Sequence, residues 1–565
     1  MLLVEPLIRI GLVNDCMTLL TLQDPGRARE YYRKGLWFAV GFYDLVVNQA
    51  RERPNHFAMR DSKRRLTWLE VERWTRAVSK RLAEAGLKPG DRVSMALSNR
   101  VEALIIFLAC SRNGFVCNPS LHRDYTTVEM KALLKDISSA AVFYERGWNA
   151  DDRDDLLRPG EELPGLVLSI CLEANAARSP CFPSSMEVGA QPEPIGRGAD
   201  KVCYLAFTSG TTGRPKGVMH SDNTILANAR DMVARWGLDE RTILLSLSPI
   251  SHHIAWVGFA QAVLAGAEFV LDDPGGGSRF DWVRETEATY VMGVPTHAMD
   301  LLSEQRERGL GRIGSIETFY MAGAPIPKTV AEAFVKQEIS PQNVYGMTEN
   351  SSHQFTHPND TTETIVGTCG KGGPAYEVQI FDSDNNRRML PPGEIGEIGG
   401  RGAALMLGYF SDQKSTEGSF NRDGWFMSGD LGRLDAEGNL EIVGRLKDII
   451  IRGGRNIFPA KIENLTIRHP SVEKAAAIAV SDLRLGEKVC LVVSCNPSAS
   501  PGPEEILGHL NKQGLSKYDM PEYFAIVNEF PLTASGKILK RELSQQVNQG
   551  LLSPLPVRFS VTCDN

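Results

Sequence analysis

The chain alternates between stretches with helical and with strand-like spacing of apolar residues. Residues 68–85 and 99–113 carry apolar side chains at the helical period, whereas residues 93–97 and 202–207 are short apolar runs typical of buried strands. The inner face of the second helix is predicted to hold Leu104, Ile105, Phe107 and Leu108. Strands and helices succeed one another as far as Ile380, which predicts an α/β domain with mostly parallel sheets and helices packed on them.

The C-terminal part of the chain has a different pattern. Residues 393–399 alternate like the hairpin strands of a small β unit, and from residue 447 a small α+β unit follows. Its predicted elements are helices over 459–469 and 504–511 and strands over 475–480, 489–495 and 524–527. Because 565 residues exceed the usual size of one core, we expect a large domain over 1–446 and a small mobile domain over 447–565, joined by a hinge.

The composition limits the class of protein and its partners. Hydrophobic residues make up 42% of the chain and charged residues 23%, values typical of globular proteins. The net charge of −7 and the lack of a basic tract argue against nucleic acid as a partner. The ten cysteines form neither a C-x-x-C pair nor a cluster with histidine, which favours free thiols in a reducing compartment.

Neither end of the chain resembles a targeting signal. The first 20 residues carry Glu5, Arg9 and Asp15 and have neither a basic start nor a clear cleavage site, so we interpret them as an extension. The C-terminus is not an S-K-L peroxisomal signal. The longest apolar run, residues 103–110, is too short to cross a bilayer. We therefore expect a cytoplasmic protein without a membrane span.

The densest candidate for chemistry is the stretch Thr-Ser-Gly-Thr-Thr-Gly-Arg-Pro-Lys-Gly-Val at residues 208–218. Its glycines, Gly210, Gly213 and Gly217, can take positive φ and let the backbone approach a ligand closely. Backbone N–H and hydroxyl groups of such a loop bind phosphate oxygens, and Arg214 and Lys216 add positive charge. The predicted phosphate-binding residues are Thr208, Ser209, Gly210, Thr211, Thr212 and Gly213.

This loop differs from the common P-loop of nucleoside triphosphatases. That motif requires Lys followed by Ser or Thr directly after its last glycine, whereas Gly213 is followed here by Arg214, Pro215, Lys216 and Gly217. A flexible surface loop without a ligand is the alternative. The close alternation of glycine, hydroxyl and cationic residues favours phosphate binding.

A second candidate is the stretch Asn-Val-Tyr-Gly-Met-Thr-Glu at residues 343–349. Gly346 permits a tight bend, and Tyr345 offers a flat face to a nucleobase. Thr348 has a hydroxyl group for a phosphate, and the Glu349 carboxylate is a hard oxygen ligand suited to Mg²⁺. A polar loop without a ligand is the alternative.

Together the stretches carry a family resemblance. Residues 208–218 are similar to the phosphate-loop signature of the adenylate-forming superfamily, which includes acyl-CoA synthetases, luciferases and the adenylation domains of peptide synthetases. The resemblance extends from about Tyr32 to about Glu542 and includes a third block at 444–463. It implies ATP, Mg²⁺ and CoA as cofactors, with Glu349 as the metal ligand. The catalytic residues that it implies are Lys216, Thr348, Glu349 and Lys537.

The resemblance also implies how the nucleoside is bound. Gly323 and Ala324 would lie flat against the adenine, where a small residue leaves room for the purine. Asp430 would hold both ribose hydroxyl groups, since one carboxylate accepts two hydrogen bonds, and Arg445 would contact the ribose beside it.

In the small domain the resemblance implies three further roles. Lys447 corresponds to the hinge, Gly454 would line the tunnel for the thiol substrate, and Lys537 would be a mobile catalytic lysine. Relatives commonly have Glu at the position of Lys461, and we interpret this difference as a surface variation, with altered contacts in one domain orientation as the alternative.

The acid substrate is expected to bind where the strand at 244–249 meets the following helix. The predicted pocket residues are His252, His253, Trp256 and Met321, with Phe259 and Met292 as further apolar candidates. Relatives that activate amino acids carry an Asp early in this helix. Its lack here would leave a substrate ammonium unpaired, at a cost on the order of several kcal/mol. A plain aryl, alicyclic or medium-chain acid is therefore favoured. Ordinary core positions and structural histidines are the alternatives.

The sequence thus predicts an acid–thiol ligase that converts a carboxylic acid and ATP to acyl-AMP and pyrophosphate, and then to a CoA thioester. One alternative is a stand-alone adenylating enzyme that loads its acyl group onto a carrier protein. Another is a nucleotide-binding protein without activity, against which the residues Lys216, Glu349, Asp430, Arg445 and Lys537 argue. We expect a monomer or a homodimer.

Overall fold

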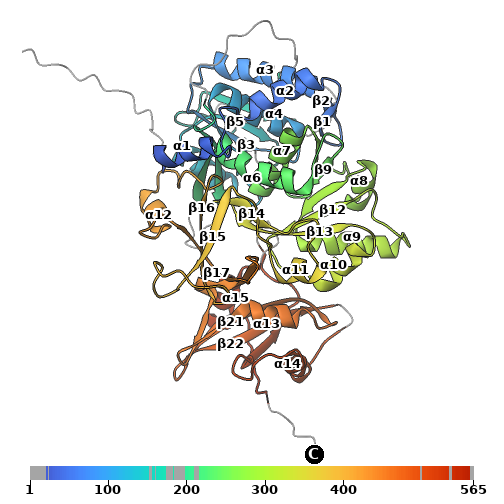
Figure 1. Ribbon diagram of the computed structural model, residues 1–565, viewed down its shortest axis with the longest axis vertical. Coiled ribbons are helices and arrows are strands. Elements are labelled where there is room, and N and C mark those ends of the chain that lie inside the picture. Colours follow the sequence, from blue (N-terminus) through green and yellow to red (C-terminus); the bar gives the residue numbers. More distant parts are fainter. Residues whose placement is uncertain are drawn as a thin grey trace, which may run out of the picture.

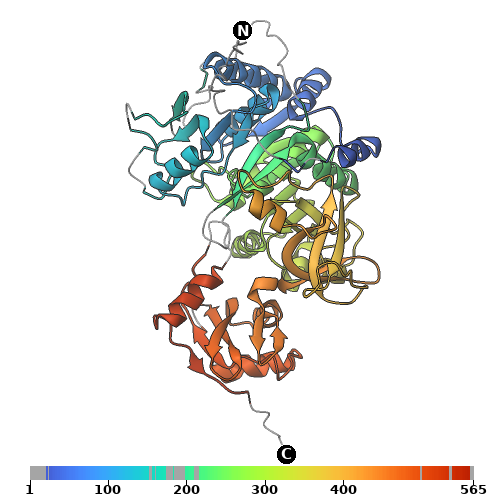
Figure 2. The same ribbon diagram turned by 90° about the vertical axis from the view of Figure 1, so that its left-hand side faces the viewer.

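The computed structural model describes residues 21–22, 24–151, 155–158, 161–173, 182–183, 198–208, 215–496, 499–532 and 538–559. Its strands form four sheets, and helices pack around them (Figure 1). The C-terminal part, drawn in orange and red, lies at one end of the elongated molecule (Figure 2). The predicted α/β fold with a small β unit and a small α+β domain is confirmed. No helix among the described residues is long and apolar enough to cross a membrane.

A six-stranded sheet with the order β6-β5-β3-β4-β7-β8 lies in the N-terminal part of the chain. Its neighbours are parallel except β7 and β8, which form an antiparallel hairpin at the edge. Strands such as β3 are buried along their whole length, as expected of a parallel sheet covered on both faces. The strands are β3 (Arg92–Ala96), β4 (Val116–Asn118), β5 (Ser139–Glu145), β6 (Leu168–Leu172), β7 (Val202–Thr208) and β8 (Lys216–Ser221).

An eight-stranded sheet follows, with the order β14-β13-β12-β11-β9-β10-β1-β2. Its central strands are parallel, and antiparallel pairs close both edges. The strands are β1 (Phe57–Arg60), β2 (Arg65–Thr67), β9 (Ile243–Ser246), β10 (Glu268–Leu271), β11 (Tyr290–Gly293), β12 (Thr318–Ala322), β13 (Ser340–Met347) and β14 (Ser351–Phe355).

Helices cover these two sheets. The helix predicted over 68–85 is α3 (Trp68–Glu84), and Thr67 is its N-cap residue. The Thr67 hydroxyl accepts from the Glu70 N–H, and the Glu70 carboxylate accepts from the Thr67 N–H. The others are α1 (Pro25–Arg33), α2 (Phe42–Glu52), α4 (Val101–Asn113), α5 (Thr127–Asp136), α6 (Asp222–Trp236), α7 (His253–Ala265), α8 (Arg279–Glu285), α9 (Pro295–Glu307), α10 (Lys328–Val335) and α11 (Thr362–Gly367).

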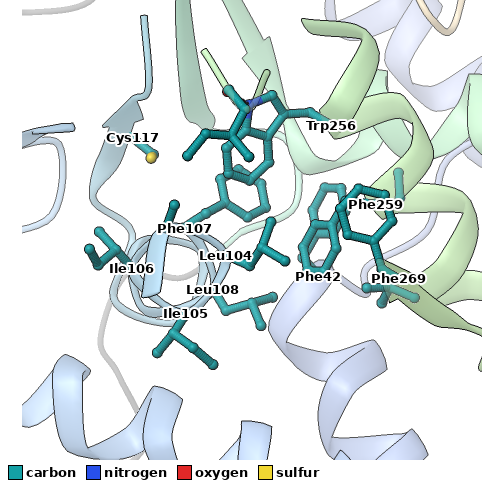
Figure 3. Packing of buried hydrophobic residues seen from close by; sticks show 14 of the residues in the cluster. Phe42, Leu104, Ile105, Ile106, Phe107, Leu108, Cys117, Trp256, Phe259 and Phe269 are labelled. Atoms are coloured by element: carbon teal, nitrogen blue, oxygen red, sulfur yellow. Dashed lines mark hydrogen bonds between the residues drawn. The ribbon is translucent and has the colours of Figure 1, made fainter. Parts of the chain in front are cut away.

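One continuous hydrophobic core joins the two sheets. It contains side chains from strands of both sheets together with α2, α3, α4, α6 and α7. All 13 residues of α4 are buried, so the predicted inner face is only part of its contact surface. Figure 3 shows the α4 side chains directed to all sides, with Phe107 beside Trp256 of α7 at 4.6 Å between ring centres. This shared core sets the position of one sheet relative to the other.

Two smaller sheets complete the fold. An antiparallel four-stranded sheet contains β15 (Tyr376–Phe381), β16 (Gly396–Gly402), β17 (Phe426–Leu434) and β18 (Leu440–Arg445), with α12 (Gln413–Gly418) between β16 and β17. The short helix η1 (Leu446–Asp448) leads into the C-terminal sheet. That part contains β19 (Ile450–Arg452), β20 (Arg455–Ile457), α13 (Pro459–Thr466), β21 (Val472–Asp482), β22 (Gly486–Cys495), α14 (Pro503–Lys512), β23 (Tyr523–Ile526), α15 (Lys540–Asn548) and β24 (Leu555–Pro556).

The seven cysteines among the described residues are free thiols, in agreement with the sequence-based expectation. Five of them are buried, which leaves them the role of small apolar side chains.

Asp231 is a buried carboxylate that joins α6 to the segment before β15. Its Oδ2 accepts a hydrogen bond from the Ala375 N–H at 2.8 Å. Gly373 passes so close that a Cβ there would lie 2.3 Å from this oxygen. Burial raises the pKa of Asp231 to about 6, against the opposing effects of the Ala375 N–H and of Arg235 and Arg230. The charged carboxylate therefore destabilises the folded state.

We expect Asp231→Asn to stabilise the large domain more at high pH than at low pH. The folded pKa lies above the ordinary value, so the stability contributed by the protonated carboxyl is complete below about pH 4 and is lost as the pH rises through about 6. The gain over wild type should be about 1–2 kcal/mol larger at about pH 8 than at about pH 5. Urea unfolding of both proteins at the two pH values measures it.

The matched control is Asp239→Asn. Arg241 lowers the pKa of the partly exposed Asp239, so its carboxyl group is charged at both pH values and the stability difference from wild type should be the same at both. A pH-independent difference for Asp231→Asn would contradict the assignment.

Candidate functional site

The hairpin of β7 and β8 carries the predicted phosphate loop. The strands pair with Thr208 opposite Lys216, so both ends of the loop are held one strand spacing apart. β7 is buried along most of its length, which gives the loop a rigid support. The other predicted phosphate ligands lie outside the described residues, and their role stays a prediction: Ser209, Gly210, Thr211, Thr212 and Gly213.

Gly217 follows this loop for a packing reason. Gly217 does not take the positive φ that the sequence allowed, since it is not among the glycines with positive φ. A Cβ at this position would lie 2.8 Å from Cζ of Phe207 and 3.0 Å from Cδ1 of Leu205. The side chains of β7 therefore occupy the space that any other residue would need.

The second motif forms the end of β13 and the turn into β14. A Cβ on Gly346 would lie 1.7 Å from the carbonyl oxygen of Ser351, so glycine is required by the close approach of two backbone segments. The tight bend that the sequence allowed at Gly346 involves no positive φ. Instead the strand pairing is irregular between Tyr345 and Met347. The Asn350 Oδ1 accepts from the Met347 N–H at 3.0 Å and stabilises the turn.

Two stacked imidazole rings contact residues of this turn and the start of β14. His220 of β8 and His253 of α7 lie 5.1 Å apart between ring centres, with planes 12° from parallel. Nε2 of His220 lies 2.6 Å from the Thr348 carbonyl oxygen, and Nε2 of His253 lies 2.9 Å from Oγ of Ser351. Burial lowers the pKa of His220 to about 4 and that of His253 well below its ordinary value. Both rings are therefore neutral at physiological pH.

Glu349 and Lys216 contact the same tyrosine. The Tyr409 hydroxyl donates to Glu349 Oε1 at 2.8 Å, and the Lys216 ammonium lies 4.6 Å from the centre of the Tyr409 ring. Burial raises the pKa of Glu349, while the Tyr409 hydroxyl and the Lys216 charge oppose the shift. Sequence reasoning missed Tyr409 because it lies in no recognisable motif.

Asp430 joins the second motif to the β17–β18 pair. Its Oδ2 accepts from the Tyr345 hydroxyl at 2.8 Å, and its Oδ1 accepts from Nε of Arg445 at 3.0 Å. Asp430 and Arg445 are directly opposite each other in the strand pair. Burial and the Asp430 charge raise the pKa of Tyr345 well above its ordinary value, so its hydroxyl remains a donor. Three of the predicted nucleotide-binding residues thus form one hydrogen-bonded group.

The Gly-Ala turn after β12 lies at the same sheet edge. Ala322, its preceding residue, pairs with Val344, which directly precedes Tyr345. Gly323 has φ +87°, in the left-handed region, and both Gly323 and Ala324 are exposed. Exposed backbone therefore lies next to the strand end that carries Tyr345, which supports the predicted contact with adenine.

The predicted acid-pocket residues do not form one group. His252 precedes α7, with its ring 4.8 Å from that of His122, and His253 is the first residue of α7. Trp256 is buried in the main core against Phe107. Met321 belongs to a second core on the other face of the eight-stranded sheet, because side chains alternate along β12. The other two apolar candidates, Phe259 and Met292, lie in the main core with Trp256.

The predicted residues of the small domain lie on exposed segments. Lys447 is exposed in η1, between the last strand of the four-stranded sheet and β19. Gly454 lies in the turn between β19 and β20 with φ +82°, and a Cβ there would meet no atom within 4 Å. Lys537 lies outside the described residues, but the ends of its loop are joined by a bridge between Leu532 and Ile538.

Two family models match the chain. Residues 46–410 match that of the AMP-binding enzymes, and residues 461–537 match that of the AMP-binding enzyme C-terminal domain. The two matched segments lie on either side of η1.

Individual relatives are similar over most of their length. The chain is 30% identical over 548 residues to a medium-chain fatty-acid–CoA ligase of Escherichia coli (strain K12), covering 95% of this chain and 96% of that protein. It is 31% identical over 514 residues to a feruloyl-CoA synthase of Amycolatopsis sp, covering 90% and 99%. The solved structure of ATP-bound MatB from Rhodopseudomonas palustris superimposes with a TM-score of 0.77 at 26% identity, covering 89% of this chain and 99% of that one. The chain therefore belongs to the family of AMP-binding enzymes, as an AMP-forming acid–CoA ligase.

Proposed function

We propose that this acyl-CoA synthetase activates an aryl, alicyclic or medium-chain carboxylic acid. The observation that carries the proposal is the meeting of separate motifs at neighbouring strand ends. Tyr345, Asp430 and Arg445 form one hydrogen-bonded group. Glu349 and Lys216 both contact Tyr409. This arrangement offers donors and acceptors for a nucleoside on one side and charges for its phosphates on the other.

The proposed reaction has two steps. A carboxylate oxygen of the acid attacks the α-phosphorus of ATP, a phosphorus–oxygen bond forms, and the bond to pyrophosphate breaks. The thiol sulfur of CoA then attacks the acyl carbon, and AMP leaves with the bonding electron pair. Lys216 and the loop hydroxyls would stabilise the negative charge that gathers during the first step. Lys537 would contribute a further positive charge between carboxylate and phosphate.

Glu349 is the residue proposed to hold Mg²⁺. Among the described residues, no group of three or more His, Cys, Asp or Glu side chains is arranged to hold a metal ion. Mg²⁺ commonly binds through one or two carboxylates together with substrate phosphates and water, so a single half-buried carboxylate fits it. When bound, Mg²⁺ neutralises phosphate charge. Glu349 would orient it from the end of the β13–β14 turn.

The neutral surroundings of His253 support an acid without an ammonium group. His253 and His220 are buried and neutral, and α7 opens with His253, Ile254, Ala255 and Trp256 without a carboxylate. An amino group placed there would lose its water without gaining an opposite charge.

We further propose that the small domain, residues 447–565, rotates about Lys447 between the two steps. The connection to the large domain is the three-residue helix η1. The open surroundings of Gly454 leave room for a thiol substrate. Rotation would exchange Lys537 for the β19–β20 hairpin at the same site.

We expect pyrophosphate release with one class of aryl, alicyclic or linear acid, and CoA thioester formation with the same class. Lys537→Ala should lower the rate of the first step by about 100-fold or more, because it removes a positive charge that stabilises the negative charge of the transition state. A coupled pyrophosphate assay across an acid panel, with and without CoA, measures both steps. The control is Lys512→Ala, an exposed lysine of the same domain.

The other outcomes of this screen separate the alternatives. Pyrophosphate release without turnover of CoA would indicate a carrier protein as the acyl acceptor. ATP binding without pyrophosphate release for any acid would contradict the proposed activity.

We expect Asp430→Asn to raise the KM for ATP by about tenfold or more. Each hydrogen bond to a charged acceptor contributes about 1.5–3 kcal/mol, and the variant weakens the bonds from Tyr345 and Arg445 as well as those proposed for the ribose. Steady-state kinetics and ATP binding by calorimetry measure the effect. Glu441→Gln on β18, which breaks the exposed ion pair with Arg433 in the same strand pair, is the control. Equal ATP affinity in both variants would exclude Asp430 from the nucleotide site.

A further inference from the structure

Residues 406–410, called the clip segment below, connect the two motifs through the backbone. Hydrogen bonds of 2.7, 2.8 and 3.0 Å pair this segment with Gly217 and Met219 of β8. On its other side, the Met406 N–H donates to the Glu349 carbonyl oxygen at 2.7 Å. The clip segment thus continues the six-stranded sheet beyond its edge and also holds the residue that ends the second motif.

Tyr409 has a fixed position within the clip segment. It pairs with Val218 of β8 as an isolated bridge, and its N–H donates to Oγ1 of Thr416 at 2.9 Å. The preceding Gly408 has φ +114°, which lets the chain turn the tyrosine toward the site. Tyr409 is 7% exposed, so its ring has little freedom to move.

The side chain of Tyr409 contacts two groups of opposite charge. Its hydroxyl donates to Glu349 Oε1 at 2.8 Å, and its ring face receives the Lys216 ammonium at 4.6 Å. An ammonium and a carboxylate that contact the same residue attract each other more strongly in a half-buried site than in water. Among the described residues, however, Lys216 and Glu349 form no ion pair with each other.

A direct Lys216–Glu349 pair would occupy both groups. The lysine charge would then be neutralised by the carboxylate and less available to phosphates, and one carboxylate oxygen would be less available to a metal ion. The tyrosine satisfies each group by a weaker contact of its own: a cation–π contact for the ammonium and one hydrogen bond for the carboxylate.

We propose that Tyr409 is a positioning residue that separates Lys216 from Glu349 and orients both for magnesium–ATP. The inference rests on the proposed function of this site. The hydroxyl orients Glu349, and the ring both carries the ammonium and blocks its path to the carboxylate. Substitutions that remove one or both of these parts therefore have different effects.

Tyr409→Phe removes the hydroxyl and keeps the ring. We expect the affinity of the ATP-bound enzyme for Mn²⁺, used as a paramagnetic substitute for Mg²⁺, to fall about 10- to 100-fold, the effect usual for partners of metal ligands. The KM for ATP at saturating metal should change less than about threefold, because Lys216 keeps its contact with the ring. Electron paramagnetic resonance of free Mn²⁺ measures the affinity without turnover.

Tyr409→Leu removes both parts, and Lys216 is then expected to pair with Glu349. Mn²⁺ affinity should fall at least as far as in Tyr409→Phe, and the KM for ATP should now rise about tenfold. Adding Lys216→Met to Tyr409→Leu should restore part of the Mn²⁺ affinity, because the competing ammonium is gone. A purely structural role of Tyr409 predicts no such recovery.

The control is Tyr523→Phe, since Tyr523 carries Lys488 on its ring in the small domain at 5.9 Å. It should leave Mn²⁺ affinity and KM unchanged. If Tyr409→Leu does not fold, as judged by circular dichroism, the isosteric Tyr409→Phe decides alone. An active wild type with unchanged Mn²⁺ affinity in Tyr409→Phe would overturn this inference and leave the proposed function standing. A wild type that binds Mn²⁺ and ATP but activates no acid would contradict the proposed function alone.

Discussion

The packing of α4 and α7 between the two large sheets is the constraint on which the site depends. The six-stranded sheet carries the phosphate-loop hairpin, and the eight-stranded sheet carries the second motif. The shared core of buried side chains fixes one sheet against the other (Figure 3). Because interiors of this density respond to changes of one methylene group, the relative position of the two strands that lead to Lys216 and Glu349 also depends on core residues that touch neither side chain.

Charge is distributed unevenly between the interior of the site and its rim. The groups beneath the β13–β14 turn are neutral, since burial depresses the pKa of His220, His253 and His353. The charged groups of the site are more exposed: Lys216 and Glu349 are half-buried, and the side chain of Arg445 is 55% exposed. His220 contacts the Thr348 carbonyl oxygen and His253 the Ser351 hydroxyl, and the neutral rings add no net charge to the site.

The sequence predicted the elements whose signals are local, and it failed where distant segments meet. α3 begins at the predicted residue 68, directly after the capping pair's Thr67, and ends one residue before the predicted 85. By contrast, sequence reasoning explained Gly346 and Gly217 by the backbone freedom of glycine, whereas the structure explains them by Ser351 and Phe207, which lie close to them across strand pairs. The grouping of Met321 with Trp256 failed for a related reason: residue spacing does not reveal which face of a sheet each side chain takes. His220 offered one usable signal, a polar residue directly after the apolar pair Val218 and Met219, and Tyr409 offered none.

The separation of opposite charges before substrate binds is a form of preorganisation. ATP brings several negative charges, and a site whose cation and carboxylate already neutralise each other would have to break that pair during binding. Here the backbone hydrogen bonds of the clip segment already hold Tyr409 in place when the protein folds, before any nucleotide binds. The free energy needed to keep Lys216 and Glu349 apart thus comes from sheet hydrogen bonds and from burial of the ring. Binding energy of the nucleotide then remains available for orienting the α-phosphate toward the acid.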